Sequence, residues 1–217
     1  MEVTSGSLGS TRTKVLVLAS TYPRWENDYE PGFVHELSRR LARDFDVVVL
    51  TPHAPGASVR QSFDGVQVCR FRYAPTRFET LIHNGGIINN LKRQRWKWLL
   101  LPLYFIALCW STFRLIKQFK PDVIHAHWLI PQGCALLFLR CIGVKVPPYL
   151  VTSHGADLFA LRSRPLKWLK RKVALQTDTV TVVSRVMVDE LRALGVPPEK
   201  IIVQPMGVDL AERFVPA

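Results

Sequence analysis

The sequence predicts an α/β protein built on a doubly wound, mainly parallel sheet. Short apolar, β-branched runs recur along the 217 residues, as buried strands require. Helical patterns lie between most of these runs, and strands that alternate with helices form parallel sheets. Apolar residues make up 48% of the chain, enough for a sizeable core.

Seven apolar runs are expected to be strands: Lys14–Ala19, Asp46–Leu50, Val66–Tyr73, Val123–Ala126, Tyr149–Ser153, Val180–Val183 and Ile201–Val203. Asp64–Gly65 marks a turn before the third. Apolar residues recur at helical spacing over four segments: Phe33–Leu41, Ala135–Cys141, Leu166–Leu175 and Val186–Leu194. Residues 1–13 are polar, without the apolar region of a signal peptide, and are expected to form a flexible tail. Residues 14–217 are then one Rossmann-like domain.

Residues 98–113 carry no charge and are almost wholly apolar. A membrane-spanning helix needs about 20 apolar residues, and this run is shorter, with Pro102 near its start. We therefore expect a buried crossover helix of the sheet. The alternative is a segment at a membrane interface, because the preceding stretch, Lys92–Trp98, interleaves basic residues with tryptophan.

The chain is strongly basic, with 29 Lys and Arg against 17 Asp and Glu and a net charge of +12. Such a charge favours an anionic partner: nucleic acid, an acidic membrane or a phosphorylated ligand. The sequence has no recognised nucleic-acid-binding motif, so we expect no nucleic acid partner. Two clusters are expected to bind an anionic membrane surface, with an ordinary solvated surface as the alternative. Their residues are Arg93, Arg95 and Lys97, followed by Lys167, Lys170 and Arg171.

Several common motifs are absent from the sequence. A GxGxxG dinucleotide fingerprint, a GxxxxGK[ST] phosphate loop and a GxSxG nucleophile elbow do not occur. The four cysteines form no CxxC pair, which excludes a zinc ribbon and a redox motif of that kind. Free thiols in a reducing compartment fit best, so we expect a cytoplasmic protein.

The segment Val151–Asp157 combines the end of a strand with His154, Gly155 and an Asp that can N-cap a helix near Leu158. Ligands of open α/β sheets bind at the carboxyl ends of the strands. We therefore expect a ligand cleft there, where helix N-termini can attract a phosphate. Besides His154, its expected residues are Tyr22, Pro31, Gly32, His127, Gly133, Gly155, Asp157, Ser184 and Gly207.

His125 and His127 lie two apart in a predicted strand, so they point to one face. With His154 they are candidates for a three-histidine metal site. No carboxylate is evident nearby to orient such ligands, so we expect no metal. We expect instead that one of the two histidines points into the cleft and the other packs.

An ordered set of motifs resembles the N-terminal domain of family 4 glycosyltransferases. The set comprises Pro121–His127, Val151–Asp157, Val180–Ser184 and Ile202–Asp209, and the resemblance covers about residues 14–214. It implies one half of the GT-B architecture, in which the N-terminal half largely binds the acceptor. The C-terminal half holds the sugar nucleotide. Such enzymes are typically retaining, and they use no metal and no cofactor beyond the nucleotide-sugar co-substrate.

The resemblance also assigns roles. His154 corresponds to the family histidine that touches the donor sugar beside the reacting carbon, and Gly32 to the loop that approaches the donor phosphates. The usual glycine pair after the first strand is replaced by Ser20–Pro23. The chain ends at Ala217, where the family crosses to its second domain.

We therefore expect the acceptor-side domain of a sugar-nucleotide-dependent hexosyltransferase. Its partners would be a nucleotide-sugar donor, a lipid-linked or cell-envelope glycan and a C-terminal glycosyltransferase domain, without which it would be inactive. It would lie peripherally at the inner face of the cytoplasmic membrane. The alternative is a catalytically silent module of the same fold that binds membranes or other partners.

Overall fold

The computed structural model describes residues 12–25, 28, 32–82, 85–160 and 162–207. Eight strands form one sheet in the order β3-β4-β2-β1-β5-β6-β7-β8, and every neighbouring pair is parallel except β3 with β4. The predicted doubly wound, mainly parallel sheet is confirmed. The strands are β1 (Lys14–Leu18), β2 (Asp46–Pro52), β3 (Arg60–Phe63), β4 (Val66–Phe71), β5 (Val123–His127), β6 (Tyr149–Ser153), β7 (Thr179–Val182) and β8 (Ile201–Val203).

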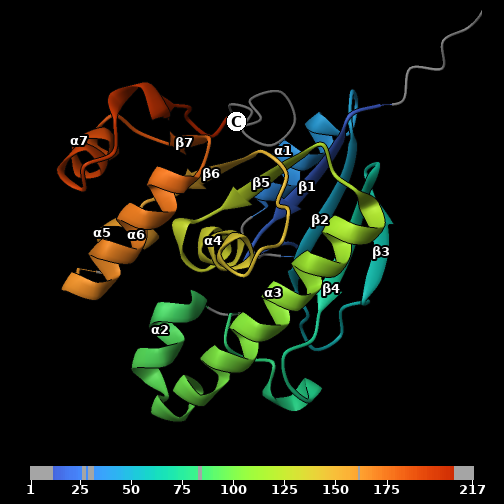
Figure 1. Ribbon diagram of the computed structural model, residues 1–217. Coiled ribbons are helices and arrows are strands. Elements are labelled where there is room, and N and C mark those ends of the chain that lie inside the picture. Colours follow the sequence, from blue (N-terminus) through green and yellow to red (C-terminus); the bar gives the residue numbers. More distant parts are fainter. Residues whose placement is uncertain (1–11, 26–27, 29–31, 83–84, 161, 208–217) are drawn as a thin grey trace, which may run out of the picture.

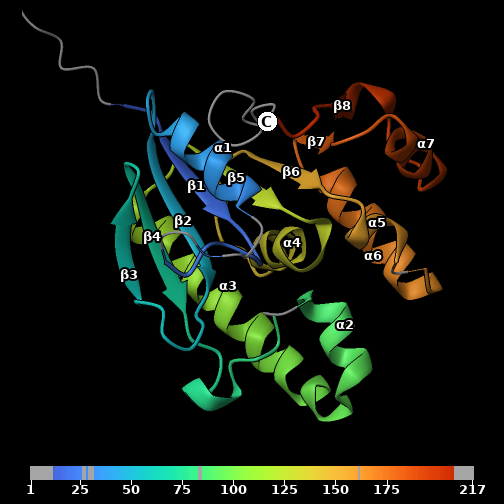
Figure 2. The same ribbon diagram turned by 180° about the vertical axis from the view of Figure 1, so that it is seen from behind.

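The helices cover the two faces of the sheet unequally (Figures 1 and 2). Of the described helices, α1 packs on one face, against Val15 and Val17 of β1. Residues of α3, α4, α6 and α7 pack on the other face with Leu16 and Leu18. The helices are α1 (Phe33–Leu41), α2 (Gly86–Arg93), α3 (Leu100–Phe119), α4 (Cys134–Cys141), α5 (Ala156–Phe159), α6 (Arg164–Gln176) and α7 (Val186–Ala193). Short turns of other helix types are η1 (Thr76–Phe78), η2 (Arg95–Leu99), η3 (Leu129–Gly133) and η4 (Pro198–Lys200).

The antiparallel edge strand β3 was not predicted from the sequence. Its residues, Arg60–Phe63, form no apolar run because the strand lies at the edge of the sheet with alternate residues exposed. The predicted turn at Asp64 and Gly65 joins it to β4, and both turn residues have positive φ. Two such residues between antiparallel strands form a tight hairpin whose twist matches that of the strands.

Helix α3 lies in the connection from β4 to β5, so its first turn is at the carboxyl edge of the sheet. The helix is terminated by Lys120, which adopts a left-handed conformation before Pro121. One side of α3, including Leu100, Tyr104 and Leu108, is buried in the core. The opposite side is exposed, so the prediction of a buried helix is wrong for half of its surface. Within the described residues, 95–119 form the one helical stretch long and apolar enough to cross a membrane by length and composition, a test that core helices also pass.

Candidate functional site

His154 follows β6 at the carboxyl edge of the sheet and is surrounded by aromatic rings. Its ring centroid lies 4.8 Å from that of Phe33 at the start of α1 and 4.9 Å from that of Trp128 after β5. Gly155, with a φ of 98°, allows the sharp turn that follows the histidine. The side chain is half-buried.

His127 holds His154 by a direct hydrogen bond, with 2.9 Å between His127 Nδ1 and His154 Nε2. The other nitrogen of His127, Nε2, is buried without a partner. A buried acceptor without a partner is less unfavourable than a buried N–H without one. The favoured tautomer of His127 therefore donates from Nδ1, and His154 carries its own proton on Nδ1. The hydrogen bond to His127 then leaves the Nδ1–H of His154 unused.

Burial keeps this histidine cluster uncharged near neutral pH. It lowers the pKa of His154 to about 4, and with the repulsion of His154 it lowers the pKa of His125 to about 4 as well. The pKa of His127 lies well below its usual value for the same reasons. The cluster therefore offers a polar contact to a ligand rather than a positive charge.

His125 and His127 lie on the same face, as predicted, and their rings stack with centroids 4.2 Å apart. Both are buried: His127 contacts His154, whereas His125 lies in the floor of a groove beside α1. Among the described residues, no group of three His, Cys, Asp or Glu side chains could hold a metal ion.

Asp157 connects two loops at this edge. One carboxylate oxygen accepts a hydrogen bond from the backbone N–H of Leu129 at 2.7 Å, and the other accepts from Ser153 Oγ at 2.8 Å. Gly155, not Asp157, stands at the N-cap of α5, so the predicted capping role is wrong. Asp157 is buried, and burial raises its pKa although these hydrogen bonds oppose the shift. The residue fixes the loop after β5 against the segment that carries His154.

A groove of about 450 Å³ runs along α1, and its lining includes Phe33 but not His154. Its floor includes a chain of polar side chains from three adjacent strands, which sequence reasoning did not identify. His125 Nε2 lies 2.7 Å from Thr152 Oγ1, which lies 2.5 Å from Thr181 Oγ1. The sequence pattern that could have identified this chain is the alternation within each strand. His125, Thr152 and Thr181 each follow an apolar residue whose side chain points to the opposite face of the sheet.

The remaining predicted cleft residues differ in their placement. Gly32 is the N-cap of α1, whose N-terminus attracts anions and whose first residue contacts His154. Ser184 follows β7 and is exposed, and Gly207 is exposed at the end of the groove. Pro31 lies outside the described residues.

Two of the predicted cleft residues belong to the core instead. Tyr22 is buried against α1, with its hydroxyl 2.7 Å from His35 Nδ1, so the prediction that it lines the cleft is wrong. Gly133 is buried beneath α6, and a Cβ atom there would lie 2.6 Å from Val173 Cγ1. Its role is the close approach of η3 to α6, not ligand contact.

We predict that Gly133→Ala lowers the free energy of unfolding by about 1–2 kcal/mol, because the added methyl group forces α6 or η3 to shift. Urea denaturation checks this. Gly207→Ala is the matched control, since nothing lies within 4 Å of the Cβ position there, and it should leave the stability unchanged. Equal stability of the two variants would contradict the packing role of Gly133.

A comparison with protein families identifies the family of this chain. The model of glycosyltransferase family 4 matches residues 33–212. The chain belongs to glycosyltransferase family 4. The family and the fold together support a sugar-transferase class, and the predicted Rossmann-like half of a GT-B enzyme is confirmed. No curated protein matches the chain.

Solved structures show the same fold as this family 4 domain. Sucrose-phosphate synthase from Thermosynechococcus elongatus is 15% identical over 91% of each chain, with a TM-score of 0.61. HepE from Anabaena, solved with UDP-glucose, is 14% identical over 92% of this chain and 45% of its own, with a TM-score of 0.55. A UDP-N-acetylglucosamine 2-epimerase from Rickettsia bellii is 10% identical over 90% and 45%, with a TM-score of 0.53. The family 4 domain therefore spans about half the length of the last two.

The structure corrects two residues of the predicted membrane clusters. In the family 4 domain, Lys97 is 5% exposed and its ammonium donates to the Thr80 carbonyl and to Asn90 Oδ1. Lys170 is fully buried, and its ammonium donates to the Leu158 carbonyl at 2.6 Å. Burial lowers the pKa of both lysines. Neither can contact a membrane, whereas the other four predicted residues, Arg93, Arg95, Lys167 and Arg171, are exposed.

We predict that the family 4 domain loses stability as the pH falls from about 6.5 to about 4. In this window the unfolded chain protonates His125 and His154, whereas the folded chain holds both neutral. Each group contributes a slope of at most about 1.4 kcal/mol per pH unit. Urea denaturation across this range checks the slope. The variant His125→Gln, which lacks one titrating group, should show a shallower slope, and an unchanged slope would contradict the assignment.

Proposed function

We propose that this chain is the acceptor-side half of a retaining, sugar-nucleotide-dependent hexosyltransferase. The observation that carries the proposal is the position of His154, which lies within the segment that matches the family and stands, as an uncharged imidazole, at the carboxyl edge of the sheet. Ligands of open α/β sheets bind at this edge.

In the proposed reaction, the bond between the anomeric carbon and the diphosphate breaks and the nucleoside diphosphate leaves, while the acceptor hydroxyl oxygen bonds to that carbon and releases its proton. His154 contacts the donor sugar beside the reacting carbon and orients it, while the N-terminus of α1 faces the phosphates. The reaction uses the sugar nucleotide as a co-substrate and no metal. A helix N-terminus contributes only about 0.3–1 kcal/mol to anion binding at an exposed site. A C-terminal half must therefore supply the positive groups that hold the diphosphate.

The proposed acceptor is a lipid-linked or cell-envelope glycan, presented at the inner face of the cytoplasmic membrane. The net charge of +12 supports a place at an anionic surface. The length of HepE supports the need for a second half. This chain covers 45% of the HepE chain, which was solved with UDP-glucose.

The test measures UDP-glucose hydrolysis and transfer by the chain alone and by the chain mixed with a C-terminal half. UDP-glucose is the first probe because a structural neighbour binds it. We expect no turnover by the chain alone and a dissociation constant near millimolar, about 4 kcal/mol of binding free energy. Activity of the mixture supports the proposal. An inactive mixture that still binds the donor would favour the silent binding module instead.

A further inference from the structure

The exposed side of α3 presents a row of large apolar side chains. Leu99, Leu103, Ile106 and Trp110 follow one another at intervals of three or four residues, and they are 74%, 49%, 64% and 60% exposed. This spacing places them along one side of a helix. Since the opposite side of α3 packs on the sheet, the helix is apolar all round, which is typical of a helix covered on every side.

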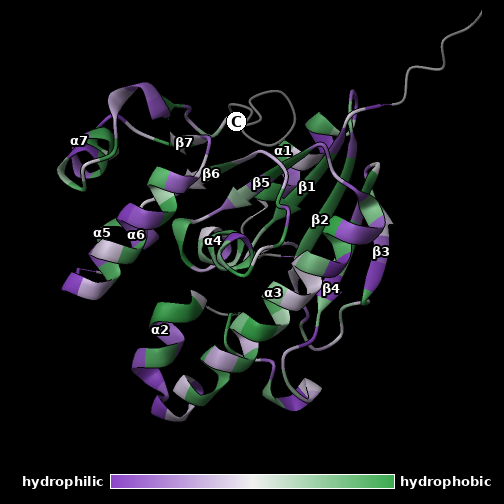
Figure 3. Cartoon of the chain, viewed as in Figure 1, coloured by the Kyte–Doolittle hydropathy of each residue, from purple (hydrophilic) through white to green (hydrophobic). Residues whose placement is uncertain are grey.

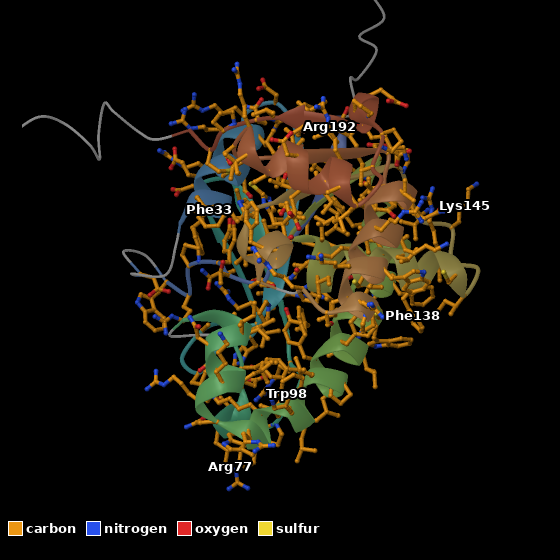
Figure 4. All side chains as sticks on the ribbon, turned by 90° about the vertical axis from the view of Figure 1, so that its left-hand side faces the viewer. Phe33, Arg77, Trp98, Phe138, Lys145 and Arg192 are labelled. Atoms are coloured by element: carbon orange, nitrogen blue, oxygen red, sulfur yellow. The ribbon has the colours of Figure 1, made fainter. Side chains whose placement is uncertain are left out.

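The neighbouring helix α4 extends this surface. The rings of Phe105 and Phe138 link α3 and α4, with centroids 5.9 Å apart. Phe138 and Ile142 are themselves exposed. Figure 3, which has α3 and α4 on the near side of the sheet, shows hydrophobic colour recurring along both helices, and Figure 4 labels Phe138 and Trp98 in the lower half of the side view. We call six exposed residues the apolar face: Leu99 at the N-cap of α3, Leu103, Ile106 and Trp110 of α3, Phe138 of α4, and Ile142 at the C-cap of α4.

The part of the sequence that carries the apolar face is predominantly basic. Residues 80–177 contain fifteen Lys and Arg but only two acidic residues, Asp122 and Asp157, and Asp157 is buried. The same side of α3 continues past Trp110 with Arg114 and Lys117, both exposed. At the other end, Arg93 and Arg95 are exposed beside Trp96 and Trp98.

We propose that the apolar face docks on the surface of an anionic lipid bilayer, with α3 lying in the interface. Apolar side chains would enter the boundary between headgroups and acyl chains, tryptophans would lie at headgroup level, and the arginines and lysines would reach the lipid phosphates. The positive charge around the apolar face disfavours a symmetric dimer formed through this face. In such a dimer, the basic residues of one copy would lie against the same basic residues of the other. The docking does not depend on the proposed transfer reaction.

Cosedimentation with vesicles tests the docking. The chain should bind vesicles of phosphatidylcholine with phosphatidylglycerol, bind pure phosphatidylcholine weakly, and lose affinity as salt rises. Ile106→Asp should weaken binding about tenfold or more, since it removes an apolar contact with the bilayer and adds a negative charge that the anionic lipids repel. Arg114→Glu with Lys117→Glu should weaken binding chiefly at low salt. Val186→Asp on α7, at a residue that is 71% exposed outside the face, is the matched control and should bind like the unmodified chain.

The two aspartate variants separate docking of the apolar face from a loss of folding and from general electrostatics. Circular dichroism and urea denaturation should show that Ile106→Asp and Val186→Asp fold alike, because both residues are exposed. Equal loss of vesicle binding in these two variants would show general electrostatics and overturn the docking of the apolar face. Absence of binding to anionic vesicles would overturn it too, as would a dimer in sedimentation equilibrium that Ile106→Asp dissociates. Donor binding by the same samples reports separately on the proposed function.

Discussion

In an active enzyme assembled with a C-terminal half, His154→Ala is expected to lower turnover at least about tenfold. In the proposed reaction the variant removes the contact of His154 with the donor sugar, and a tenfold loss corresponds to about 1.4 kcal/mol of transition-state stabilisation. The variant also leaves the buried His127 Nδ1 without its described partner, so some stability is lost, and urea denaturation must show that the variant is folded in the assay. Steady-state kinetics with the sugar nucleotide check the prediction.

The tautomer of His154 makes this test more specific. If the histidine donates from Nδ1, His154→Asn retains an N–H close to that position and should recover part of the lost turnover. His154→Gln places its amide near Nε2, where His127 lies, and should recover less. Unchanged kinetics in the alanine variant would show that His154 only shapes the turn. Equal recovery by the two amides would contradict the assigned tautomer.

Asp157→Ala is expected to lower the free energy of unfolding by about 2–4 kcal/mol. The variant leaves the buried N–H of Leu129 and the hydroxyl of Ser153 without their acceptor, and unsatisfied buried donors are costly. Urea denaturation monitored by circular dichroism measures the loss.

Asp178 provides the control for Asp157. Its carboxylate also accepts a hydrogen bond from a backbone N–H, that of Tyr149 at 2.9 Å, but the residue is exposed. Water can replace the carboxylate there, so Asp178→Ala should cost about 1 kcal/mol or less. Similar losses in the two variants would contradict the explanation by burial. Asp157→Asn, which keeps one acceptor oxygen, should lie between them.

Most of the parallel strands could be predicted because they are buried on both faces and therefore form apolar runs. The short strand β8 forms an apolar run too, although two of its residues are exposed. The same reasoning missed β3, whose Arg60–Phe63 lie at the edge of the sheet and need not be apolar. Helix α3 could be placed but not oriented. Its apolar residues occur on every side, so only the packing against the sheet decides which side is buried.

The candidate site could be predicted in position but not in its contacts. The spacing of His125 and His127 predicts a shared face, but the hydrogen bond of His127 to His154 depends on β5 and β6 being neighbours in register. The composition identifies basic clusters, but it does not show that the carbonyl groups of Thr80 and Leu158 bind Lys97 and Lys170 inside the protein. These contacts join residues 12 to 27 positions apart that only the tertiary fold brings together.

The direction of α3 has a consequence for how the proposed enzyme would meet its acceptor. The first turn of the helix lies at the sheet edge that carries His154, so a chain docked through α3 would keep its cleft within reach of lipid headgroups. Its search for a lipid-linked acceptor would then be two-dimensional. At a fixed bulk concentration of acceptor, dilution with inert phospholipid would slow the reaction, because the rate would follow the mole fraction of acceptor in the membrane.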